Sequence, residues 1–377
     1  MNDPIPLTTP YLGEEEVEAA AEAIRSGWVA QGPRVAEFEA GFAEAVGAME
    51  GVAVSSATAG LHLAMISLGI GPGDEVVVPS LSFIASANAP RYVGATPVFA
   101  DVDPKTFNLT AGTIEQVISD RTRAIIVVHQ LGMPADIQAI RSLCEARGIE
   151  VVEDAACAIG STYRGEPIGS HSGHVIFSLH PRKLLTTGEG GMITTSSGLA
   201  ARLRRLRQHG MTASGFERSR ADRVIVEEYI EEGYNYRLTD IQAAIGIVQL
   251  GRLDEIVEQR RKQAAFYTHS FDGLRGITTP ADPSYGTTNH QSFWIRVDDD
   301  ASTTRDGLIA SLGARGIAAK PALMAAHLEP TFSGHPHAPL PVTEQIHRDG
   351  LVIPLFHGMS DQQLATVAGE VIRVAGA

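Results

Sequence analysis

Short runs of apolar and β-branched residues alternate with helical patterns between about residues 50 and 195. The runs are apolar throughout instead of at every second position, which is typical of strands that helices cover on both faces. We therefore expect strands at residues 52–55, 75–79, 96–100, 124–129, 149–153, 174–178 and 191–195. Helical patterns between them span residues 59–68, 84–93, 111–118 and 135–147. This alternation predicts an α/β fold with a mainly parallel sheet and functional side chains at the carboxyl ends of its strands.

The pattern changes after Gly210. Residues 211–233 are polar and charged with little periodicity, as in a flexible surface loop. A long helical section follows at residues 239–271, and the chain ends with a strand pattern at 291–297 and helical patterns at 305–315 and 361–374. We expect a large domain over residues 1–250 and a smaller C-terminal α+β domain over residues 251–377, linked by the long helix. The N-terminal segment is expected to pack near the small domain.

Composition narrows the classes of function. The 377 residues include 30 basic and 44 acidic ones, and the resulting net charge of −14 argues against a nucleic-acid surface. The two cysteines, Cys144 and Cys157, are too few for a disulfide framework and favour a reduced compartment. The first residues lack the pattern of a secretory signal, and no apolar run reaches the roughly 20 residues that cross a bilayer. We therefore expect a cytoplasmic protein that binds neither nucleic acid nor membrane.

The segment FSLHPRKLLTTGEGGMITT, residues 177–195, carries a lysine just before a glycine-rich turn. Such a turn lets the backbone approach a ligand closely, and a lysine beside it can form an imine with an aldehyde cofactor. Taken alone, however, the segment fits better a hairpin with a solvated lysine. The assignment of Lys183 as an imine-forming lysine therefore depends on residues in other parts of the chain.

Three further features follow predicted strands. Asp154 could hold a cofactor ring nitrogen protonated, although a helix cap explains it equally simply. Thr58 stands where a helix begins and could bind a phosphate, or merely cap that helix. Phe83 could stack on a flat ring, although core packing is the more common role of such a residue. Together with Lys183 these residues supply the set that pyridoxal phosphate requires. The chain has no dinucleotide fingerprint, phosphate-binding P-loop, zinc-ligand spacing or G-x-S-x-G motif.

Several longer motifs make the chain recognisable. They are SGWVAQGPRVAEFE (26–39), SSATAGLHLA (55–64), GATPVFADVDPKTFNL (94–109), VEDAACAIG (152–160), FSLHPRKLLTTGEGGM (177–192) and GYNYRLTDIQAAIG (233–246). With them the chain resembles the DegT/DnrJ/EryC1/StrS family of sugar aminotransferases over nearly its whole length. The resemblance implies an aspartate aminotransferase-like fold of type I, a three-layer α/β/α large domain with a seven-stranded sheet and a smaller α+β domain.

The resemblance also implies roles for single residues. Lys183 corresponds to the imine-forming lysine that shuttles protons, and Asp154 to the partner of the ring nitrogen. Asn235 corresponds to a residue that reaches the phosphate in a neighbouring subunit, which implies a homodimer with shared active sites and makes residues 211–233 an active-site loop. The complete set of implied cofactor-binding residues is Ala57, Thr58, Phe83, Asp154, Cys157, Ser178 and Asn235.

The chain departs from its relatives at two of these positions. Ala57 stands where many relatives have glycine, and its backbone N–H is retained. Cys157 stands where relatives often have glutamine or histidine bound to the phenolic oxygen of the cofactor, and a thiol is a weak donor. Another group then binds that oxygen, or the proton affinity of the imine differs. A small buried thiol without a catalytic role is the simpler interpretation of Cys157.

The lysine also separates two activities. Family members that act as dehydratases have histidine in its place, so Lys183 favours amino transfer. We expect glutamate or glutamine as the donor, pyridoxamine phosphate as the second form of the cofactor, and a nucleotide-linked 4-keto-6-deoxy sugar as the acceptor, with a 3-keto sugar less favoured. The predicted substrate contacts are His180, Lys320 and His327, which ordinary packed or surface residues would equally explain. The alternatives are an aminotransferase for a cyclitol or other non-nucleotide ketone, a dehydratase, and a non-catalytic regulator that binds the cofactor.

Overall fold

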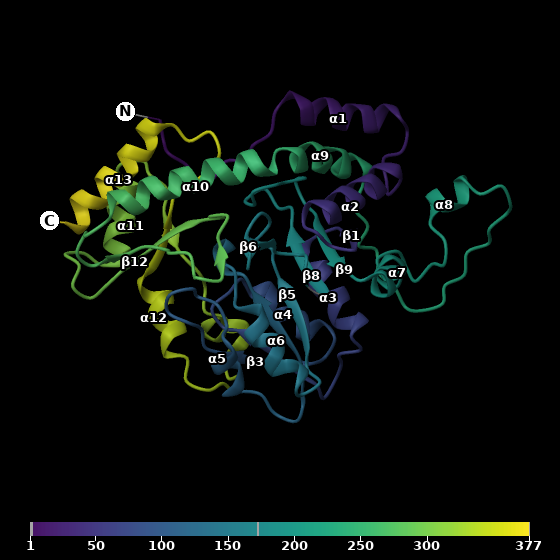
Figure 1. The fold of residues 1–377 in the computed structure, drawn as a ribbon, viewed down its shortest axis with the longest axis horizontal. Coiled ribbons are helices and arrows are strands. Elements are labelled where there is room, and N and C mark those ends of the chain that lie inside the picture. The colour runs from purple at the N-terminus through teal and green to yellow at the C-terminus, as the bar shows by residue number, and fades with distance from the viewer. Residues whose placement is uncertain (1–2, 172, 377) are drawn as a thin grey trace.

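A seven-stranded sheet forms the centre of the molecule (Figure 1), and the computed structural model describes residues 3–171 and 173–376. The strand order is β1-β9-β8-β5-β4-β2-β3. The strands from β8 to β3 run parallel, whereas β9 is antiparallel to both of its neighbours. The predicted mainly parallel sheet is confirmed. Its strands are β1 (Glu50–Val54), β2 (Glu75–Pro79), β3 (Thr96–Ala100), β4 (Thr122–Val128), β5 (Glu150–Asp154), β8 (His174–Ser178) and β9 (Gly191–Thr195).

Helices cover both faces of this sheet, which explains why its strands are apolar throughout. Val77 of β2 points into a core formed with α2 (Pro33–Ala45), α5 (Ala111–Glu115), α6 (Ile137–Glu145) and α9 (Asp240–Gly251). Its neighbours Val76 and Val78 point to the opposite face. That face is covered by α3 (Ala57–Ser67), α4 (Ile84–Tyr92) and α7 (Ser197–Leu206). Helices α1 (Glu14–Arg25), α2 and α7 are additional to those predicted from the sequence.

The predicted long helical section is two consecutive helices. The first, α9, begins with a capping box in which Thr239 and Gln242 satisfy each other's backbone N–H groups. Asp240, the next residue, accepts hydrogen bonds from the N–H groups of Gly32 and Val35, at 2.7 and 3.0 Å, and so caps α2 from another part of the chain. After a break at Arg252, α10 (Leu253–Ser270) continues along the edge of the molecule (Figure 1).

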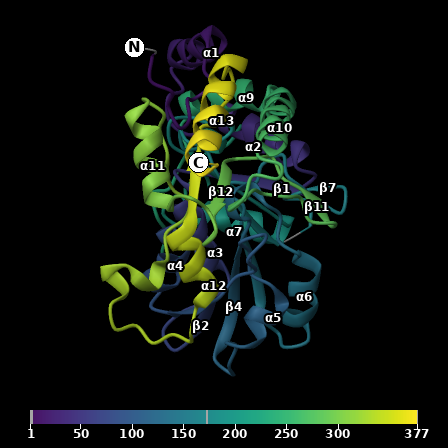
Figure 2. The same cartoon turned by 90° about the vertical axis from the view of Figure 1, so that its left-hand side faces the viewer.

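Residues after α10 form a second sheet of four strands in the order β10-β12-β14-β13. Helices α10, α11 and α13 pack against it, as Figure 2 shows. Ile5 joins the same core and pairs with Ile317. A division of the chain near residue 250 stays a prediction. The elements of this part are β10 (Ile277–Thr278), β12 (Phe293–Val297), α11 (Arg305–Ala314), β13 (Lys320–Pro321), α12 (Pro341–Asp349), β14 (Gly350–Ile353), α13 (Asp361–Ala375) and the short turns η2 (Ala326–Leu328) and η3 (Pro330–Phe332).

Residues 211–236, here called the arm, leave the body of the molecule after α7 (Figure 1). The arm has little regular structure apart from α8 (Gly215–Ser219), as its polar sequence predicts. The remaining elements are a small sheet of β6 (Thr162–Tyr163), β7 (Glu166–Pro167) and β11 (Gly286–Thr287), and the turn η1 (Gln130–Gly132). Within the described residues, no helix is long and apolar enough to span a membrane.

Candidate active site

Lys183 lies on a closed loop at the carboxyl edge of the large sheet. The loop, residues 179–190, connects β8 to β9, and its two ends are joined by a hydrogen bond of 2.9 Å from the Leu179 N–H to the Gly190 carbonyl. The half-buried Lys183 places its Nζ 3.0 Å from the Sγ of Cys157. Because the loop begins and ends on paired strands, the sheet fixes the position of the lysine.

Asp154 is the last residue of β5 and is 5% exposed. Its Oδ2 accepts a hydrogen bond of 2.7 Å from the hydroxyl of Ser86, and its Oδ1 accepts one of 3.2 Å from the N–H of Ala156. Ser86 lies in the first turn of α4, where its N–H bonds to the carbonyl of Phe83. Phe83 is exposed, with 62% of its surface accessible. A held carboxylate and an uncovered aromatic face therefore belong to connected elements.

The preceding residue, Glu153, faces the other way, because successive side chains of a strand point to opposite faces. Its Oε2 is 3.0 Å from Nε2 of His129, and its Oε1 accepts a 2.6 Å hydrogen bond from Arg141 of α6. The N–H of Ala135 donates to Nδ1 of His129, so Nε2 of that ring is the protonated nitrogen and donates to the carboxylate. Of the two adjacent acids, only Asp154 is oriented toward α4.

The beginning of α3 forms an anion cradle beside β9. The Ser56 hydroxyl accepts the N–H of Ala59, which leaves the N–H groups of Ala57 and Thr58 without a partner inside the helix. Gly191, the first residue of β9, makes the close approach possible: a Cβ there would lie 2.6 Å from the Ser56 carbonyl carbon and 2.7 Å from the Ala57 nitrogen. Free N–H groups at a helix start bind phosphate well.

Ser178 lies next to this cradle. It ends β8 and is paired in register with Gly191. The structure thus gathers five kinds of group at one sheet edge: a phosphate cradle, a buried carboxylate, an aromatic face, a thiol and an amine. Their chemistry fits pyridoxal phosphate, whose phosphate, ring nitrogen, ring face and aldehyde each have a matching partner. The residues that would hold it are Ala57, Thr58, Phe83, Asp154, Cys157, Ser178 and Lys183.

The backbone beside Asn235 reaches this edge, but among the described residues no hydrogen bond joins its side chain to the other predicted site residues. Its neighbour Tyr236 accepts a hydrogen bond of 2.8 Å from the N–H of Ser55, and its own backbone pairs with Gln208. Its side chain is exposed, and in the described part of the chain that side chain makes no hydrogen bond. Its predicted role toward a neighbouring subunit stays a prediction.

The predicted substrate contacts lie in different surroundings. Partial desolvation, together with the positive charges of Arg182 and Lys183, lowers the pKa of Lys320, so this amine is close to the loop that carries the lysine. His180 lies on that same loop, where its Nδ1 accepts the N–H of Arg182 at 3.2 Å. His327 is buried, and its Nδ1 is 2.7 Å from the hydroxyl of Ser80.

The other contacts of the His327 ring are with His337, whose ring centroid is 4.8 Å away, and Glu344, whose Oε1 is 3.6 Å from Nε2. None of these residues is among the predicted site residues. Burial, followed by the charge of His337, lowers the pKa of His327. This geometry gives a substrate contact by His327 no support, so that role remains untested.

Three residues that hold the site in place were not predicted from the sequence. Ser86 lies within the motif that contains Phe83, and a hydroxyl one turn into a helix facing β5 is the signal that could have indicated it. Asn289 donates from Nδ2 to the carbonyl of Cys157 at 2.9 Å. Gln291 donates to the carbonyl of Arg182 at 2.6 Å and accepts the N–H of Leu184 at 3.2 Å. No local pattern identifies the last two, because their partners are more than 100 residues away.

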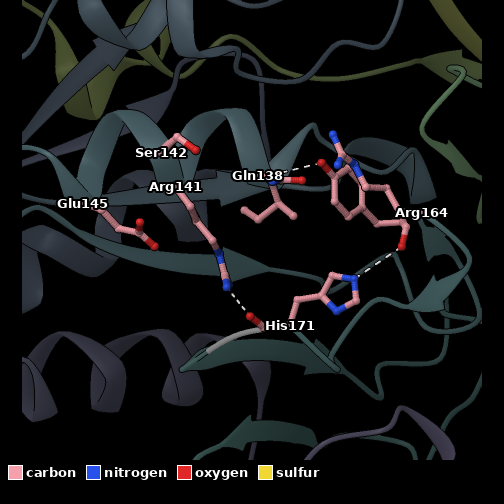
Figure 3. Close-up of a pocket in the computed structure, with 8 residues that line it drawn as sticks. Gln138, Arg141, Ser142, Glu145, Arg164 and His171 are labelled. Carbon is pink, nitrogen blue, oxygen red and sulfur yellow. Dashed lines mark hydrogen bonds between the residues drawn. The ribbon is translucent and has the colours of Figure 1, made fainter.

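A separate pocket of about 320 Å³ lies over α6 (Figure 3). Figure 3 shows Arg141 reaching from that helix toward the carbonyl of His171, to which it donates a hydrogen bond. Its lining residues are Ile137, Gln138, Arg141, Ser142, Glu145, Tyr163, Arg164 and His171. None of them is a predicted site residue, so this pocket is distinct from the Lys183 site. Among the residues that the structure describes, no group of His, Cys, Asp or Glu side chains could hold a metal ion.

The chain is similar to known proteins over nearly its whole length. Residues 10–372 match the DegT/DnrJ/EryC1/StrS aminotransferase family. The aminotransferase TlmJ from Streptoalloteichus hindustanus is 39% identical, with 97% of each chain covered and a TM-score of 0.89. DesV from S. venezuelae, solved in complex with a ketimine intermediate, is 34% identical, with 100% of each chain covered and a TM-score of 0.90. Spr1654 from Streptococcus pneumoniae, assigned as a sugar aminotransferase and solved in its PMP form, is 27% identical, with 99% of each chain covered and a TM-score of 0.92. This chain belongs to the DegT/DnrJ/EryC1/StrS aminotransferase family.

Proposed function

We propose that this chain is a pyridoxal-phosphate-dependent aminotransferase that moves an amino group from glutamate or glutamine to a nucleotide-linked 4-keto-6-deoxy sugar. The observation that carries the proposal is the position of Lys183. Its amine lies at the carboxyl edge of the sheet, 3.0 Å from Cys157 and on the same edge as Asp154. An amine nucleophile at the site of a buried carboxylate and an anion cradle is the arrangement that this chemistry needs.

Several residues of the site have defined tasks in this proposal. Pyridoxal phosphate, when bound, carries the amino group between the two substrates and withdraws electrons from the carbon that loses a proton. The start of α3 holds the phosphate, and Phe83 covers one face of the ring. Asp154, oriented by Ser86, keeps a proton on the ring nitrogen. Lys183 moves a proton between the reacting carbons through its Nζ.

Lys320 and Arg182 support an acceptor that carries negative charge. Both side chains are exposed, and neither takes part in an ion pair with an acidic side chain within residues 3–171 and 173–376. The effect of Arg182 and Lys183 on the pKa of Lys320 indicates that these positive charges are close together. A diphosphate would neutralise them, whereas an uncharged cyclitol ketone would leave them unpaired.

Lys183 is tested by trapping the cofactor on the protein. Borohydride should fix pyridoxal phosphate to Lys183, detected as a mass increase on the peptide that contains it. The Lys183→Ala variant should show no fixed cofactor and should lose about 10⁴-fold in the rate of amino transfer. A variant that still turns over at the normal rate would overturn the proposed mechanism.

The acceptor is tested on enzyme loaded with pyridoxamine phosphate. Each of a panel of keto compounds is added, and return of the aldehyde absorbance reports transfer. Nucleotide-linked 4-keto sugars should restore this absorbance, and 3-keto sugars should do so less well. Restoration by cyclitol ketones alone would replace the proposed acceptor with a non-nucleotide one.

We further propose that two copies of the chain form the working enzyme. The arm carries exposed apolar side chains on an element that leaves the body of the molecule (Figure 1). Apolar groups of this kind mark protein–protein contacts. They are Val224, Val226, Tyr229 and Ile230, with exposed fractions of 90%, 77%, 64% and 57%. Asn235 lies at the base of the same arm, and its exposed side chain would also be available to that second copy.

A further inference from the structure

Residues 80–86, here called the ring segment, follow β2 and include the first turn of α4. The ring segment carries Phe83, which is proposed to cover the cofactor ring, and Ser86, whose hydroxyl donates to Asp154 at 2.7 Å. Because Phe83 is exposed, packing of its own side chain does not fix its position. The position of Phe83 therefore depends on what holds the backbone just before it.

Residues 324–327 hold that backbone from a distant part of the sequence. Leu81 forms an antiparallel bridge with Ala325, and the N–H of Ser82 donates to the carbonyl of Met324 at 3.1 Å. A pairing as short as this is only marginally stable by itself. A side chain that joins the two stretches would therefore add a large share of what holds them together.

His327 supplies such a side chain. Its backbone N–H donates to Oγ of Ser80 at 3.2 Å, and its Nδ1 lies 2.7 Å from the same oxygen. Both residues are buried, with exposed fractions of 7% for His327 and 0% for Ser80. A hydrogen bond between buried groups is costly to lose, because each partner is then left without water to replace the other.

The surroundings of the ring fix the direction of this hydrogen bond. Nε2 of His327 lies 3.6 Å from Oε1 of Glu344 and makes no hydrogen bond within the part of the chain that the structure describes. A proton on Nε2 is attracted by that carboxylate, whereas a lone pair there would be repelled. Burial, followed by the charge of His337, lowers the pKa of His327, which favours the neutral ring. With its single proton on Nε2, the ring accepts the hydroxyl proton of Ser80 at Nδ1.

We propose that His327 is a positioning residue that acts through Ser80 to fix the ring segment, and with it the place of Phe83 over the cofactor. The same segment carries Ser86, so the hydrogen bond also supports the residue that orients Asp154. The inference rests on the proposed function, because Phe83 has a ring to cover only if pyridoxal phosphate binds.

The first test uses the full-length protein without pyridoxal phosphate and measures hydrogen exchange of residues 80–86 by peptide mass spectrometry. His327→Leu fills the buried space but removes the hydrogen bond, and should raise the exchange rate of the Ser82 N–H about tenfold. His327→Asn keeps an acceptor near the position of Nδ1 and should restore most of the protection. If these two variants exchange alike, the hydrogen bond does not hold the ring segment and the inference is overturned.

Two further variants separate positioning from a general loss of stability. Ser80→Ala removes the other partner of the bond, should reproduce the effect of His327→Leu, and takes over the test if that variant does not fold. His335→Leu is the matched control, because Nε2 of His335 lies 2.7 Å from the carbonyl of Pro97 in β3. It should lower thermal stability but leave the exchange of residues 80–86 at the wild-type rate. Equal exchange in His335→Leu and His327→Leu would overturn the inference.

The second test adds pyridoxal phosphate and measures the circular dichroism of the bound cofactor, which reports how the protein holds its ring. In His327→Leu and Ser80→Ala this signal should decrease and the apparent Kd should rise about tenfold, whereas His335→Leu should keep the wild-type values. An unchanged signal in the first two variants would overturn the inference. The exchange test needs no cofactor, so its failure removes the role of His327 alone. A wild-type protein that binds no pyridoxal phosphate would instead remove the proposed function.

Discussion

The lysine loop, residues 179–190, connects two strands of the large sheet, whereas the arm, residues 211–236, follows α7, and the two segments are held very differently. The loop closes on itself between Leu179 and Gly190, and Gln291 binds it from outside. The arm is tied to the body at its base, where Glu231 forms ion pairs with Arg202 and Arg205 at 3.1 Å, and from there it extends away from the body of the molecule (Figure 1). Val224 and Val226 of the arm are exposed.

The difference separates the site residues that contacts within one chain hold in place from those that are expected to act in a second chain. Contacts within the chain fix the positions of Lys183, Cys157 and Asp154. Asn235 has no such contacts for its side chain within the described residues, although the same resemblance assigns it to the same cofactor. Changes in the first region should therefore alter chemistry in each subunit, whereas changes in the second should alter assembly first.

After the loss of Lys183 itself, the largest effect is expected at the buried carboxylate. Asp154→Asn keeps the shape of the side chain but removes the charge that holds a proton on the cofactor ring. The single-turnover rate of amino transfer should fall about 1,000-fold. Thermal unfolding and cofactor absorbance serve as controls for an intact protein. A rate within tenfold of the wild type would show that the held carboxylate is not part of the chemistry.

The arm should respond through assembly. Replacing two exposed apolar residues in the double variant Val224→Asp/Val226→Asp should weaken the dimer about 100-fold, measured by sedimentation velocity over a range of concentrations. Val17→Asp is the matched control, because Val17 is also exposed, at 60%, but lies on α1. If the double variant stays dimeric while the control dissociates, the interface lies at α1 and not at the arm.

Acidification should lower the stability of the large sheet. Burial lowers the pKa of His174 in β8 to about 4, so between about pH 6.5 and 4 the unfolded chain takes up a proton that the folded chain refuses. Stability is therefore complete above pH 6.5 and should decrease by about 3 kcal/mol on acidification to pH 4. The free energy of unfolding is measured by urea titration at several pH values. The His174→Gln variant should lose this part of the pH dependence, and an unchanged slope would assign the acid sensitivity to other groups.

The smallest effect is expected at Ser86, which acts on the site only through Asp154. Ser86→Ala removes the hydroxyl that donates to Asp154 at 2.7 Å and should lower the rate about tenfold, as expected for one hydrogen bond to a charged group. Ser86→Thr keeps the hydroxyl and should recover most of the rate. If alanine and threonine behave alike, the hydrogen bond does not position the carboxylate.

The strands could be predicted because helices cover both sheet faces, which leaves long apolar runs with sharp ends. The runs at 75–79, 96–100, 174–178 and 191–195 have the same bounds in the structure. The reversed direction of β9 could not be predicted, since an apolar run has the same pattern in both directions, and β9 is antiparallel to its neighbours.

The site was predictable where its residues follow strands, and not where they come from distant loops. Asp154 ends β5, as its motif suggests. Asn289 reaches Cys157 across 132 residues, and nothing local to either residue encodes that contact. The function of the arm was also not predictable from its composition. A polar sequence alone does not distinguish a flexible loop from a loop that binds a second surface.

The pairing that closes the two ends of the lysine loop has an evolutionary consequence. Ser178 pairs with Gly191 and Leu179 bonds to Gly190, so the strand pairing at the two ends of the loop does not involve the side chain of Lys183. The half-buried Lys183 can therefore be replaced without loss of this pairing, whereas Leu184 and Leu185 are constrained because they are buried in the core. Replacement of Lys183 by histidine, the residue found in dehydratase relatives, would exchange the reactive group while the fold is inherited unchanged.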